Sequence, residues 1–308
     1  MKKIKLARLL LRAFALFPKK YKLRSRVKTS EDPFFIFGSG RNGSTLLNVI
    51  LNQHPEIFLP PEQYFIGNSI IKFQLYNHIL WRDLVKIIYG ELVKETGSHS
   101  WNFDPGIITN QAFLFEGEQR NMENILHHIY SNCAGQNGKS NVLWGDSTPM
   151  NTRYLNEIYS CFPNAKYIFL VRDGRDVTAA YKKGKPETFD KLINPEHSSD
   201  LWIKSIKKYN WLKKRTNVLL VKYEDLVSTP ETELKKIIHY LNREFDTEML
   251  NFQNKVPDIK EYQESHHKNL HTPIKTTSIG QWKELLNASE KELVSEKLNP
   301  YLKQFNYQ

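Results

Sequence analysis

A glycine-rich turn between an apolar run and an amphipathic segment is the first feature that could do chemistry. Phe34–Phe37 predicts a short buried strand, and the glycine-rich residues 38–43 follow it directly. Ser44 and Thr45 then open a segment whose leucines and isoleucines recur at helical spacing. A strand, a glycine turn and a helix start can form a phosphate cradle, because glycines let the backbone approach an anion and free N–H groups point towards it.

The spacing of this turn resembles the P-loop of nucleotide hydrolases, G-x-x-x-x-G-K-[ST], except at one position. Gly38, Gly43 and Thr45 fit the pattern, but Ser44 stands where the lysine should be. That lysine normally reaches the β- and γ-phosphates, and the hydroxyl after it holds a magnesium ion. We therefore expect phosphate binding without metal-assisted hydrolysis of ATP or GTP. A turn that joins strand and helix and binds no ligand is the alternative.

A second buried-strand pattern, Tyr167–Val171, ends in the charged sequence RDGRD at residues 172–176. Together with the turn, GSGRNGSTLL, it resembles the sulfotransferases that use 3′-phosphoadenosine 5′-phosphosulfate (PAPS). In that family a P-loop-like GxxRSGTTLL holds the 5′-phosphosulfate, and a strand ending in VRDGRD holds the 3′-phosphate. Residues 221–226 (VKYEDL) and 278–282 (SIGQW) resemble later motifs of the family, so the likeness spans about residues 33–305.

The resemblance, to bacterial carbohydrate and protein-tyrosine sulfotransferases in particular, implies both a fold and a reaction. The fold is three-layer α/β/α with a mostly parallel sheet, as in P-loop NTPases. The reaction moves a sulfuryl group from PAPS to a hydroxyl or amine, with no metal. The residues that the resemblance assigns to PAPS are Gly40, Arg41, Asn42, Gly43, Ser44, Thr45, Arg172, Thr178, Ser278, Gly280 and Lys275.

Glu62 and Arg41 are the candidate catalytic residues. In the protein-tyrosine sulfotransferases a catalytic glutamate lies as far after the loop arginine as Glu62 lies after Arg41. A hydroxyl that attacks sulfur must lose its proton, and a carboxylate within hydrogen-bond reach can accept it. A solvated loop glutamate is the alternative for Glu62, and a salt bridge within residues 172–176 is the alternative for Arg172.

Two positions depart from the family pattern. Many relatives carry a lysine where this chain has Ser147, and that lysine touches the bridging oxygen. Relatives also carry a serine where this chain has Ala180, so Thr178 is the candidate to replace that phosphate contact. If the chain is active, Arg41 and another cation must supply the missing charge; Arg153, Lys182 and Lys183 are candidates that are near enough in sequence.

The charge of the chain is concentrated at its N-terminus. Net charge is +11 over 308 residues, and residues 1–30 hold eleven of the 44 basic residues and no acidic one. The remainder is balanced, so nucleic-acid binding is not expected. We predict a basic amphipathic tail over residues 1–30 and one sulfotransferase domain over residues 31–308. A helical acceptor-site insertion is expected at about 63–130, with residues 97–120 irregular.

Residues 4–17 are rich in leucine, alanine and phenylalanine, with Lys5, Arg8 and Arg12 along one helical face. The run is too short and too charged for a transmembrane helix, and it lacks the features of a secretory signal. We expect a helix on an anionic membrane surface, with a helix packed on the protein itself as the alternative. Two cysteines are too few for a disulfide framework. The expected location is therefore cytoplasmic, with possible attachment at the inner face of the membrane.

Other function classes stay open. One is a kinase-type enzyme that uses ATP and magnesium, which the missing P-loop lysine opposes. The other is a non-catalytic nucleotide-binding relative at a membrane surface, which Ser147 and Ala180 favour. The acceptor is open as well, and the tail favours a glycan or glycolipid over a small alcohol or a tyrosyl peptide. The histidines of residues 254–277 lack the ordered spacing of a metal site.

Overall fold

The computed structural model describes residues 2–13, 18–26, 30–94, 101, 104–184, 190–257, 259, 262 and 270–307. The chain forms two compact units. The first, called the helical unit, comprises Met1–Pro33 and Pro55–Ala165. The second, called the sheet unit, comprises Phe34–His54 and Lys166–Gln308. None of the described helices has the length and the apolarity that crossing a bilayer requires.

Parallel strands form the centre of the sheet unit. β1 (Phe34–Phe37) pairs with β4 (Lys166–Val171), and β4 pairs with β5 (Val218–Lys222). All of β1 and nearly all of β4 are buried, as is typical of parallel strands with both faces covered. The helices of this unit are α2 (Ser44–Leu51), α8 (Gly174–Lys182), α10 (Pro195–Leu212), α11 (Tyr223–Ser228), α12 (Pro230–Tyr240), α14 (Trp282–Leu285) and α15 (Ala288–Leu302), with 3₁₀ turns η5 (Asp190–Ile193), η6 (Thr247–Asn254) and η8 (Lys303–Phe305).

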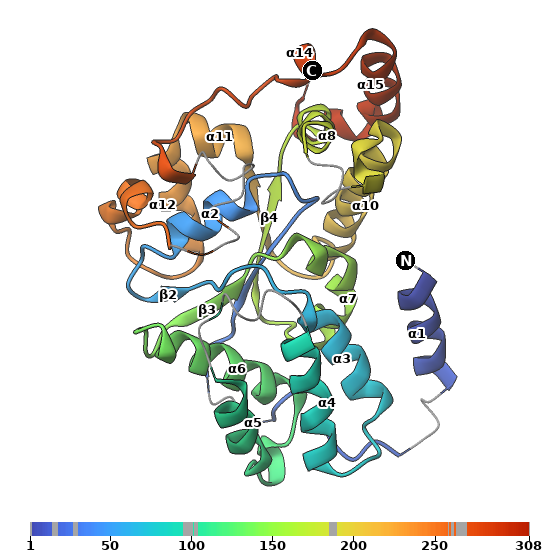
Figure 1. Cartoon of the computed structure of the whole chain (residues 1–308), viewed down its shortest axis with the longest axis vertical. Coiled ribbons are helices and arrows are strands. Elements are labelled where there is room, and N and C mark those ends of the chain that lie inside the picture. The colour runs from blue at the N-terminus through green and yellow to red at the C-terminus, as the bar shows by residue number, and fades with distance from the viewer. Residues whose placement is uncertain are drawn as a thin grey trace. The chain divides into compact units, whose positions relative to one another are not determined.

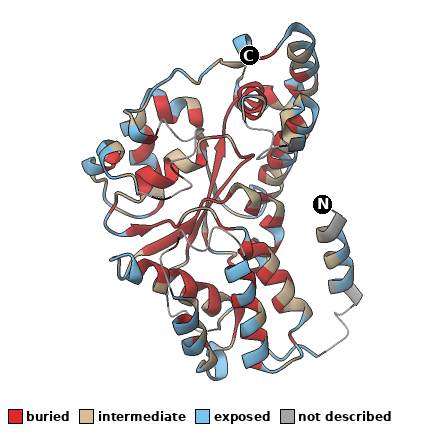
Figure 2. Cartoon of the chain, viewed as in Figure 1, coloured by how far each residue is buried: buried red, intermediate tan, exposed pale blue. Residues whose placement is uncertain are grey.

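The helices of the sheet unit cover both faces of its strands. Figure 1 shows α2, α11 and α12 on one side of β4, and α8, α10 and α15 on the other. The buried positions gather on the strands and on the helix faces turned towards them (Figure 2). Stacked aromatic rings, such as Phe169 on Tyr209 with centroids 4.6 Å apart, fill the space between β4 and α10. The three expected layers are therefore present.

The helical unit has two short strands among many helices. β2 (Ile57–Phe58) and β3 (Leu143–Asp146) pair in parallel. The strand order β2-β3-β1-β4-β5 confirms the expected mostly parallel α/β sheet. The other elements of the helical unit are α1 (Lys2–Ala13), α3 (Phe65–Leu75), α4 (Trp81–Lys94), α5 (Pro105–Phe113), α6 (Met122–Gln136) and α7 (Leu155–Cys161), with 3₁₀ turns η3 (Gly117–Gln119) and η4 (Pro149–Tyr154).

The expectation of irregular structure over residues 97–120 is wrong for α5. Asp104 caps this helix, because its side chain accepts hydrogen bonds from the N–H groups of Gly106 and Ile107. Pro105 occupies the first helical position, where its missing N–H costs nothing. The aspartate–proline pair was a readable helix start, and the loop-like composition around it hid that signal.

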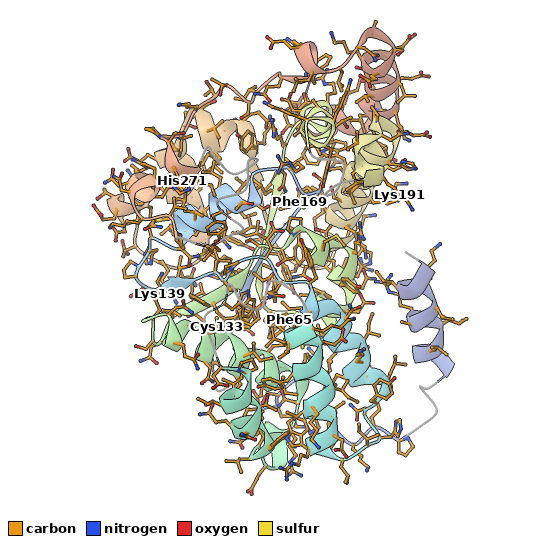
Figure 3. The ribbon with its side chains drawn as sticks, viewed as in Figure 1. Phe65, Cys133, Lys139, Phe169, Lys191 and His271 are labelled. Carbon is orange, nitrogen blue, oxygen red and sulfur yellow. The ribbon has the colours of Figure 1, made fainter. Side chains whose placement is uncertain are left out.

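Lys139 links the turn after α6 to β2. Its ammonium group donates to the carbonyl oxygen of Ile57 at 2.6 Å, and burial lowers the pKa of Lys139 to about 8; its side chain is labelled in Figure 3. In the unfolded chain a lysine has a pKa of about 10.4. Between these two values the unfolded state binds more protons than the folded state. Folding should therefore become more favourable as the pH rises through that window.

The variant Lys139→Met should lose this dependence on pH. Between pH 7 and pH 9.5 we expect the wild type to gain about 1 kcal/mol of unfolding free energy relative to the variant, after discounting for the solvent that still reaches the side chain. Urea unfolding at the two pH values measures this difference. Lys207→Met, at an exposed position of α10, is the control. Equal pH slopes for the wild type and both variants would show that Lys139 titrates normally.

Candidate active site

The turn after β1 has a backbone that requires glycine. Gly40 and Gly43 have φ angles of 74° and 97°, and Arg41 between them has 53°. A Cβ atom at Gly43 would also lie 2.5 Å from the ring of Tyr223. Residues in this left-handed conformation turn successive N–H groups towards one concavity, a geometry that binds anions. The structure therefore has the backbone expected of a phosphate cradle, directly before α2.

Asn42 fixes this turn to the sheet. Its side chain is buried, donates from Nδ2 to the carbonyl oxygen of Leu170 at 2.8 Å and accepts from the N–H of Ser44 at 3.3 Å. On α8, Tyr181 donates its hydroxyl to the carbonyl oxygen of Ser39 at 3.1 Å. The sequence assigned Asn42 to the nucleotide. Since its side chain is committed to β4, a nucleotide contact from this residue would come from its backbone.

Arg172 lies at the end of β4 and joins two distant segments. Its Nη1 donates to the carbonyl oxygen of Arg41 at 3.1 Å, and its Nη2 donates to the carbonyl oxygen of Ser278 at 2.5 Å. The guanidinium carbon lies 4.7 Å from the ring centroid of Tyr223, whose hydroxyl is 2.5 Å from the hydroxyl of Ser278. The structure thus brings the predicted residues Arg41, Arg172 and Ser278 together within the sheet unit.

One hydrogen-bond donor of Arg172 is left over. Arg172 is 7% exposed, and its Nε atom has no hydrogen-bond partner among the described residues. A buried donor without a partner costs about 1–3 kcal/mol of stability, and the cost is higher when the group is charged. The Nε atom can therefore still donate a hydrogen bond to a ligand. Arg172 follows the carboxyl end of β4, which is where α/β sheets bind their ligands. No salt bridge of Arg172 with Asp173 or Asp176 occurs among the ion pairs of the described residues.

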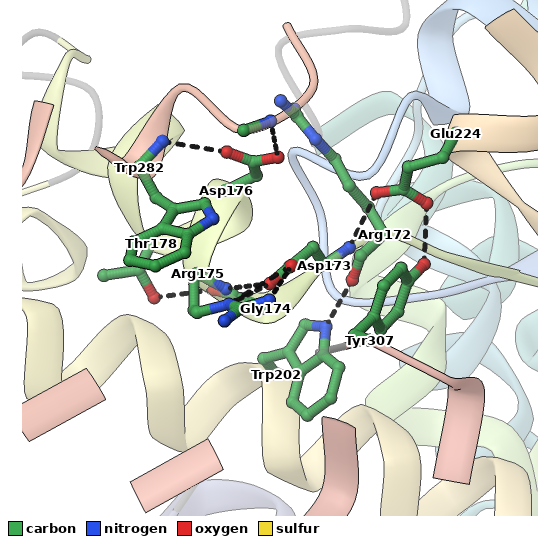
Figure 4. Close-up of polar contacts among 11 residues, drawn as sticks. Arg172, Asp173, Gly174, Arg175, Asp176, Thr178, Trp202, Glu224, Trp282 and Tyr307 are labelled. Carbon is green, nitrogen blue, oxygen red and sulfur yellow. Dashed lines mark hydrogen bonds and ion pairs between the residues drawn. The ribbon is translucent and has the colours of Figure 1, made fainter. Parts of the chain in front are cut away.

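Asp176 holds the segment that contains Ser278 and Gly280. Its carboxylate accepts from the N–H groups of Gly280 at 2.7 Å and Trp282 at 2.9 Å (Figure 4). Burial raises the pKa of Asp176, while these two hydrogen bonds and the charge of Arg172 oppose the rise. The guanidinium of Arg175, paired with Asp173, lies over the ring of Trp282. Most charges of the RDGRD sequence therefore position neighbouring backbone.

Three other predicted residues stand differently. Thr178 is fully buried and donates its hydroxyl to the carbonyl oxygen of Gly174 at 2.9 Å, inside α8, so we leave it out of the proposed phosphate contacts. Lys275 is exposed, and Lys182 is paired with Glu290 at 2.5 Å.

His266 and His267 lie outside the described residues. Within the described ranges, no three His, Cys, Asp or Glu side chains are placed to hold a metal ion.

In the helical unit, the backbone on both sides of Glu62 is anchored. Trp101 donates from Nε1 to the carbonyl oxygen of Pro61 at 2.9 Å. The N–H of Gln63 donates to the hydroxyl of Thr148 at 3.0 Å. The Glu62 carboxylate itself is half-buried and accepts a long hydrogen bond, 3.4 Å, from the hydroxyl of Tyr64. The glutamate is therefore a partly solvated side chain on a fixed backbone.

Asp146, which the sequence did not single out, organises the residues around Thr148. It is 2% exposed and accepts hydrogen bonds from the Tyr130 hydroxyl at 2.6 Å, the Asn151 amide at 2.7 Å and the Thr148 N–H at 2.9 Å. Burial raises the pKa of Asp146, and the three hydrogen bonds oppose that rise. Ser147 beside it is buried as well. An aspartate at the end of a short strand, before the polar residues 147 and 148, was the available signal.

Comparison with known proteins decides the family. A sequence profile described as the sulfotransferase family matches residues 33–247, more than half of the chain. The chain belongs to the sulfotransferase family. The sulfotransferase domain of the Synechococcus PCC 7002 olefin synthase shares the fold of this sulfotransferase, with a TM-score of 0.57 and 21% identity over 91% of this chain and 98% of that one. The sulfotransferase domain from the curacin biosynthetic pathway shares it as well, with a TM-score of 0.55 and 19% identity over 88% of this chain and 99% of that one.

Several curated relatives of this sulfotransferase are named protein-tyrosine sulfotransferases. A putative one from Caenorhabditis briggsae is 23% identical over 223 residues, 71% of this chain and 69% of that protein. One from Drosophila melanogaster is 24% identical over 259 residues, 80% of this chain. The alignments span only about half of the Drosophila protein (46%) and of protein-tyrosine sulfotransferase 1 from Danio rerio (52%). The expected enzyme class, a transferase of sulfate groups, is confirmed at the level of the family.

The role of Asn42 in the sulfotransferase can be tested through stability. Asn42→Ala removes the partner of a buried carbonyl group, so we expect a loss of about 1–3 kcal/mol in unfolding free energy. Urea unfolding measures the loss, and Asn254→Ala, at an exposed position, should change stability by less than about 0.5 kcal/mol. Equal stability of Asn42→Ala and the wild type would mean that the side chain does not hold the turn to β4.

Proposed function

We propose that this sulfotransferase moves a sulfuryl group from PAPS to a hydroxyl or amine of its acceptor. The observation that carries the proposal is the buried Nε of Arg172, which has no hydrogen-bond partner among the described residues and lies next to a turn with the backbone of an anion cradle. A dianionic 3′-phosphate supplies the acceptor that this guanidinium lacks, and arginine can bind phosphate through two parallel hydrogen bonds. Two anion-binding features in one unit suit a donor with two phosphate groups.

The proposed contacts divide between the two phosphates of PAPS. The backbone N–H groups of residues 40–45, with the side chains of Arg41, Ser44 and Thr45, hold the 5′-phosphosulfate. Arg172 holds the 3′-phosphate, and Ser278 with Gly280 lines the same end of the site; Lys275 remains a candidate from the sequence. When the sulfuryl group leaves, negative charge grows on the 5′-phosphate. Fixed N–H donors aimed at that charge stabilise the transition state.

Glu62 is the proposed general base. The acceptor oxygen forms a bond to sulfur while the bond from sulfur to the 5′-phosphate oxygen breaks, and the acceptor proton passes to the carboxylate. A half-buried glutamate on an anchored backbone suits this role, because a base must lie within about 3 Å of the proton that it removes. The charge that relatives supply by a lysine at the Ser147 position is assigned to Arg41.

The acceptor is proposed as a hydroxyl-bearing molecule. The sequence favours a glycan or glycolipid. The names of the matched relatives favour the tyrosyl peptide, which the sequence also left open, as the second candidate. The two differ in the acidity of the attacking group, since a phenol has a pKa near 10 and loses its proton more readily than a sugar hydroxyl. Transfer assays with both acceptor classes would separate them.

Calorimetric titration with adenosine 3′,5′-bisphosphate tests the donor. We expect binding of this ligand without metal, and little binding of ATP with magnesium. ATP binding in its place would favour the kinase-type alternative. Binding of the bisphosphate with no transfer to any acceptor would favour the non-catalytic alternative, for which Ser147 and Ala180 would be the first positions to change.

Arg172→Ala should weaken bisphosphate binding by about 2 kcal/mol, about thirtyfold, because a charge-assisted contact is lost. Arg172→Lys should lose less, since the charge remains while the planar fork is gone. Calorimetry measures both, and Arg215→Ala, at an exposed position, is the control that should bind normally. Unchanged affinity in the alanine variant would refute the 3′-phosphate assignment.

Glu62→Gln should leave bisphosphate affinity intact and slow turnover by about 100-fold or more, because the amide cannot accept the acceptor's proton. Initial-rate assays with radiolabelled PAPS measure the effect. Glu56→Gln, an exposed glutamate in the same connection, should keep full activity. Full activity of Glu62→Gln would place the base elsewhere in the chain.

A further inference from the structure

Helix α1 turns an arginine towards the helical unit and leucines away from it. Arg8 donates from Nε and Nη2 to the two carboxylate oxygens of Glu157 at 2.6 and 2.7 Å, and from Nη2 to the carbonyl oxygen of Arg153 at 3.3 Å. Ile4 and Ala7, on the same side as Arg8, are partly buried. The leucines on the other side are exposed: Leu6 by 57%, Leu9 by 62% and Leu10 by 41%.

The packing of α1 combines the two alternatives that the sequence left open. Arg8 docks the helix on the protein through a two-point ion pair with Glu157, whose side chain is only 8% exposed. The docked helix then presents an apolar strip of three leucines to solvent. Contiguous exposed apolar side chains are unusual on a soluble protein and mark an interaction surface. Arg8 is therefore the basic residue of α1 whose described contacts hold the helix in place, while Lys5 is exposed.

After α1, residues 20–26 run along the helical unit with alternating exposure. Tyr21, Leu23 and Ser25 are partly buried, and the basic residues between them are exposed: Lys20, Lys22, Arg24 and Arg26. This alternation is the period-two pattern of an extended chain that lies on a surface. We call the four exposed side chains the basic ladder. Among the described ion pairs, Lys22 with Glu118 is the one that involves the ladder.

Hydrogen bonds fix this segment to the helical unit. Tyr21 exchanges two hydrogen bonds of 2.8 Å with the side-chain amide of Asn77, and its ring lies against Trp81 with centroids 5.1 Å apart. Glu123 donates from its N–H to the carbonyl oxygen of Leu23 at 3.1 Å and accepts from the N–H of Ser25 at 2.8 Å. The backbone that carries the ladder is thus held in an ordered row along the helical unit.

The leucine strip and the basic ladder are close along the chain. α1 ends at Ala13 and the next described residue is Pro18, and five extended residues span at most about 18 Å. Pro18, two residues before the ladder, therefore lies within about 18 Å of the end of α1. Residues 1–30 carry eleven basic residues and no acidic one, so the complementary partner of this region is anionic.

We propose that α1 and the basic ladder form a docking surface for an anionic phospholipid bilayer. Leu6, Leu9 and Leu10 enter the boundary between headgroups and acyl chains, and the ladder contacts lipid phosphates. The combination is what selects a bilayer: an acidic polypeptide or a nucleic acid would use the cations and leave the leucines exposed, whereas a bilayer satisfies both. This inference does not depend on the identity of the sulfuryl donor or acceptor.

Co-sedimentation of the full chain with vesicles tests the proposal. The vesicles are phosphatidylcholine alone or phosphatidylcholine with 30% phosphatidylserine, at low and at high salt. We expect binding to the anionic vesicles at low salt, weakened by salt, and about tenfold less binding to neutral vesicles, because screening and loss of lipid charge remove the electrostatic part. Failure to bind either vesicle type, or equal binding to both, would overturn the proposal.

Paired variants separate the two components. Leu6→Glu with Leu9→Glu, and separately Lys20→Glu with Arg24→Glu, should each lower binding to anionic vesicles by about tenfold or more. The matched controls are Leu114→Glu with Leu293→Glu and Lys207→Glu with Lys214→Glu, all at exposed positions, and these should bind as the wild type does. Circular dichroism checks that each variant is folded. Test variants that bind like their controls would refute the surface.

A fluorophore on α1 reports which side meets the lipid. The native Cys133 and Cys161 are buried, so a thiol-reactive dye should label an introduced cysteine selectively. Leu9→Cys should show a blue shift of the dye emission with anionic vesicles, and Ala7→Cys, on the side towards the protein, should show little. A shift at Ala7 alone would reverse the assignment. The proposal would also be wrong if the wild type formed a dimer and bound no vesicles, and if the leucine variants were monomers. A second copy of the chain would then cover the leucines.

Discussion

The need of a buried guanidinium for hydrogen-bond acceptors shapes the centre of the sheet unit. A buried guanidinium whose N–H donors lack partners is costly. The carbonyl groups of Arg41 and Ser278 accept hydrogen bonds from this guanidinium. Arg41 lies 131 residues before Arg172 in the sequence, and Ser278 lies 106 residues after it. The turn after β1 and the segment before α14 therefore converge on one side chain. The Nε atom that remains is the part of this arrangement that calls for an anion.

The carboxylates near Arg172 serve the same convergence. Asp176 accepts from the backbone of Gly280 and Trp282, and Glu224 accepts from the N–H of Asp173 and from the hydroxyl of Tyr307 near the C-terminus (Figure 4). Burial raises the pKa of both carboxyl groups, and backbone N–H donors oppose that rise. These acids bind the chain's own amides. Among the described residues, neither of these carboxylates forms a direct ion pair with Arg172.

Sequence alone predicted the parts of this structure that are local. β1 and β4 could be predicted as continuous apolar runs, because both faces of a parallel sheet are covered. The turn could be predicted from its glycines, because Gly40 and Gly43 adopt positive φ angles that other residues rarely adopt. The task of Asn42 could not be predicted, because its partner Leu170 is 128 residues away and any polar residue in a loop suggests a ligand contact. The hydrogen bond of Thr178 could not be predicted either, since its hydroxyl donates to the carbonyl oxygen of Gly174 within its own helix.

Ser147, at the position where the family resemblance led us to expect a lysine, belongs to a segment that hydrogen bonds hold in place. Its neighbour Asp146 gathers three donors, and Thr148 accepts the N–H of Gln63, the residue after Glu62. A catalytic base gains its effect from being held at hydrogen-bond distance from its substrate, and small displacements reduce the rate steeply. The segment thus retains a positioning function that does not need a cation. A serine at position 147 is therefore compatible with the observed anchoring of the backbone around Glu62.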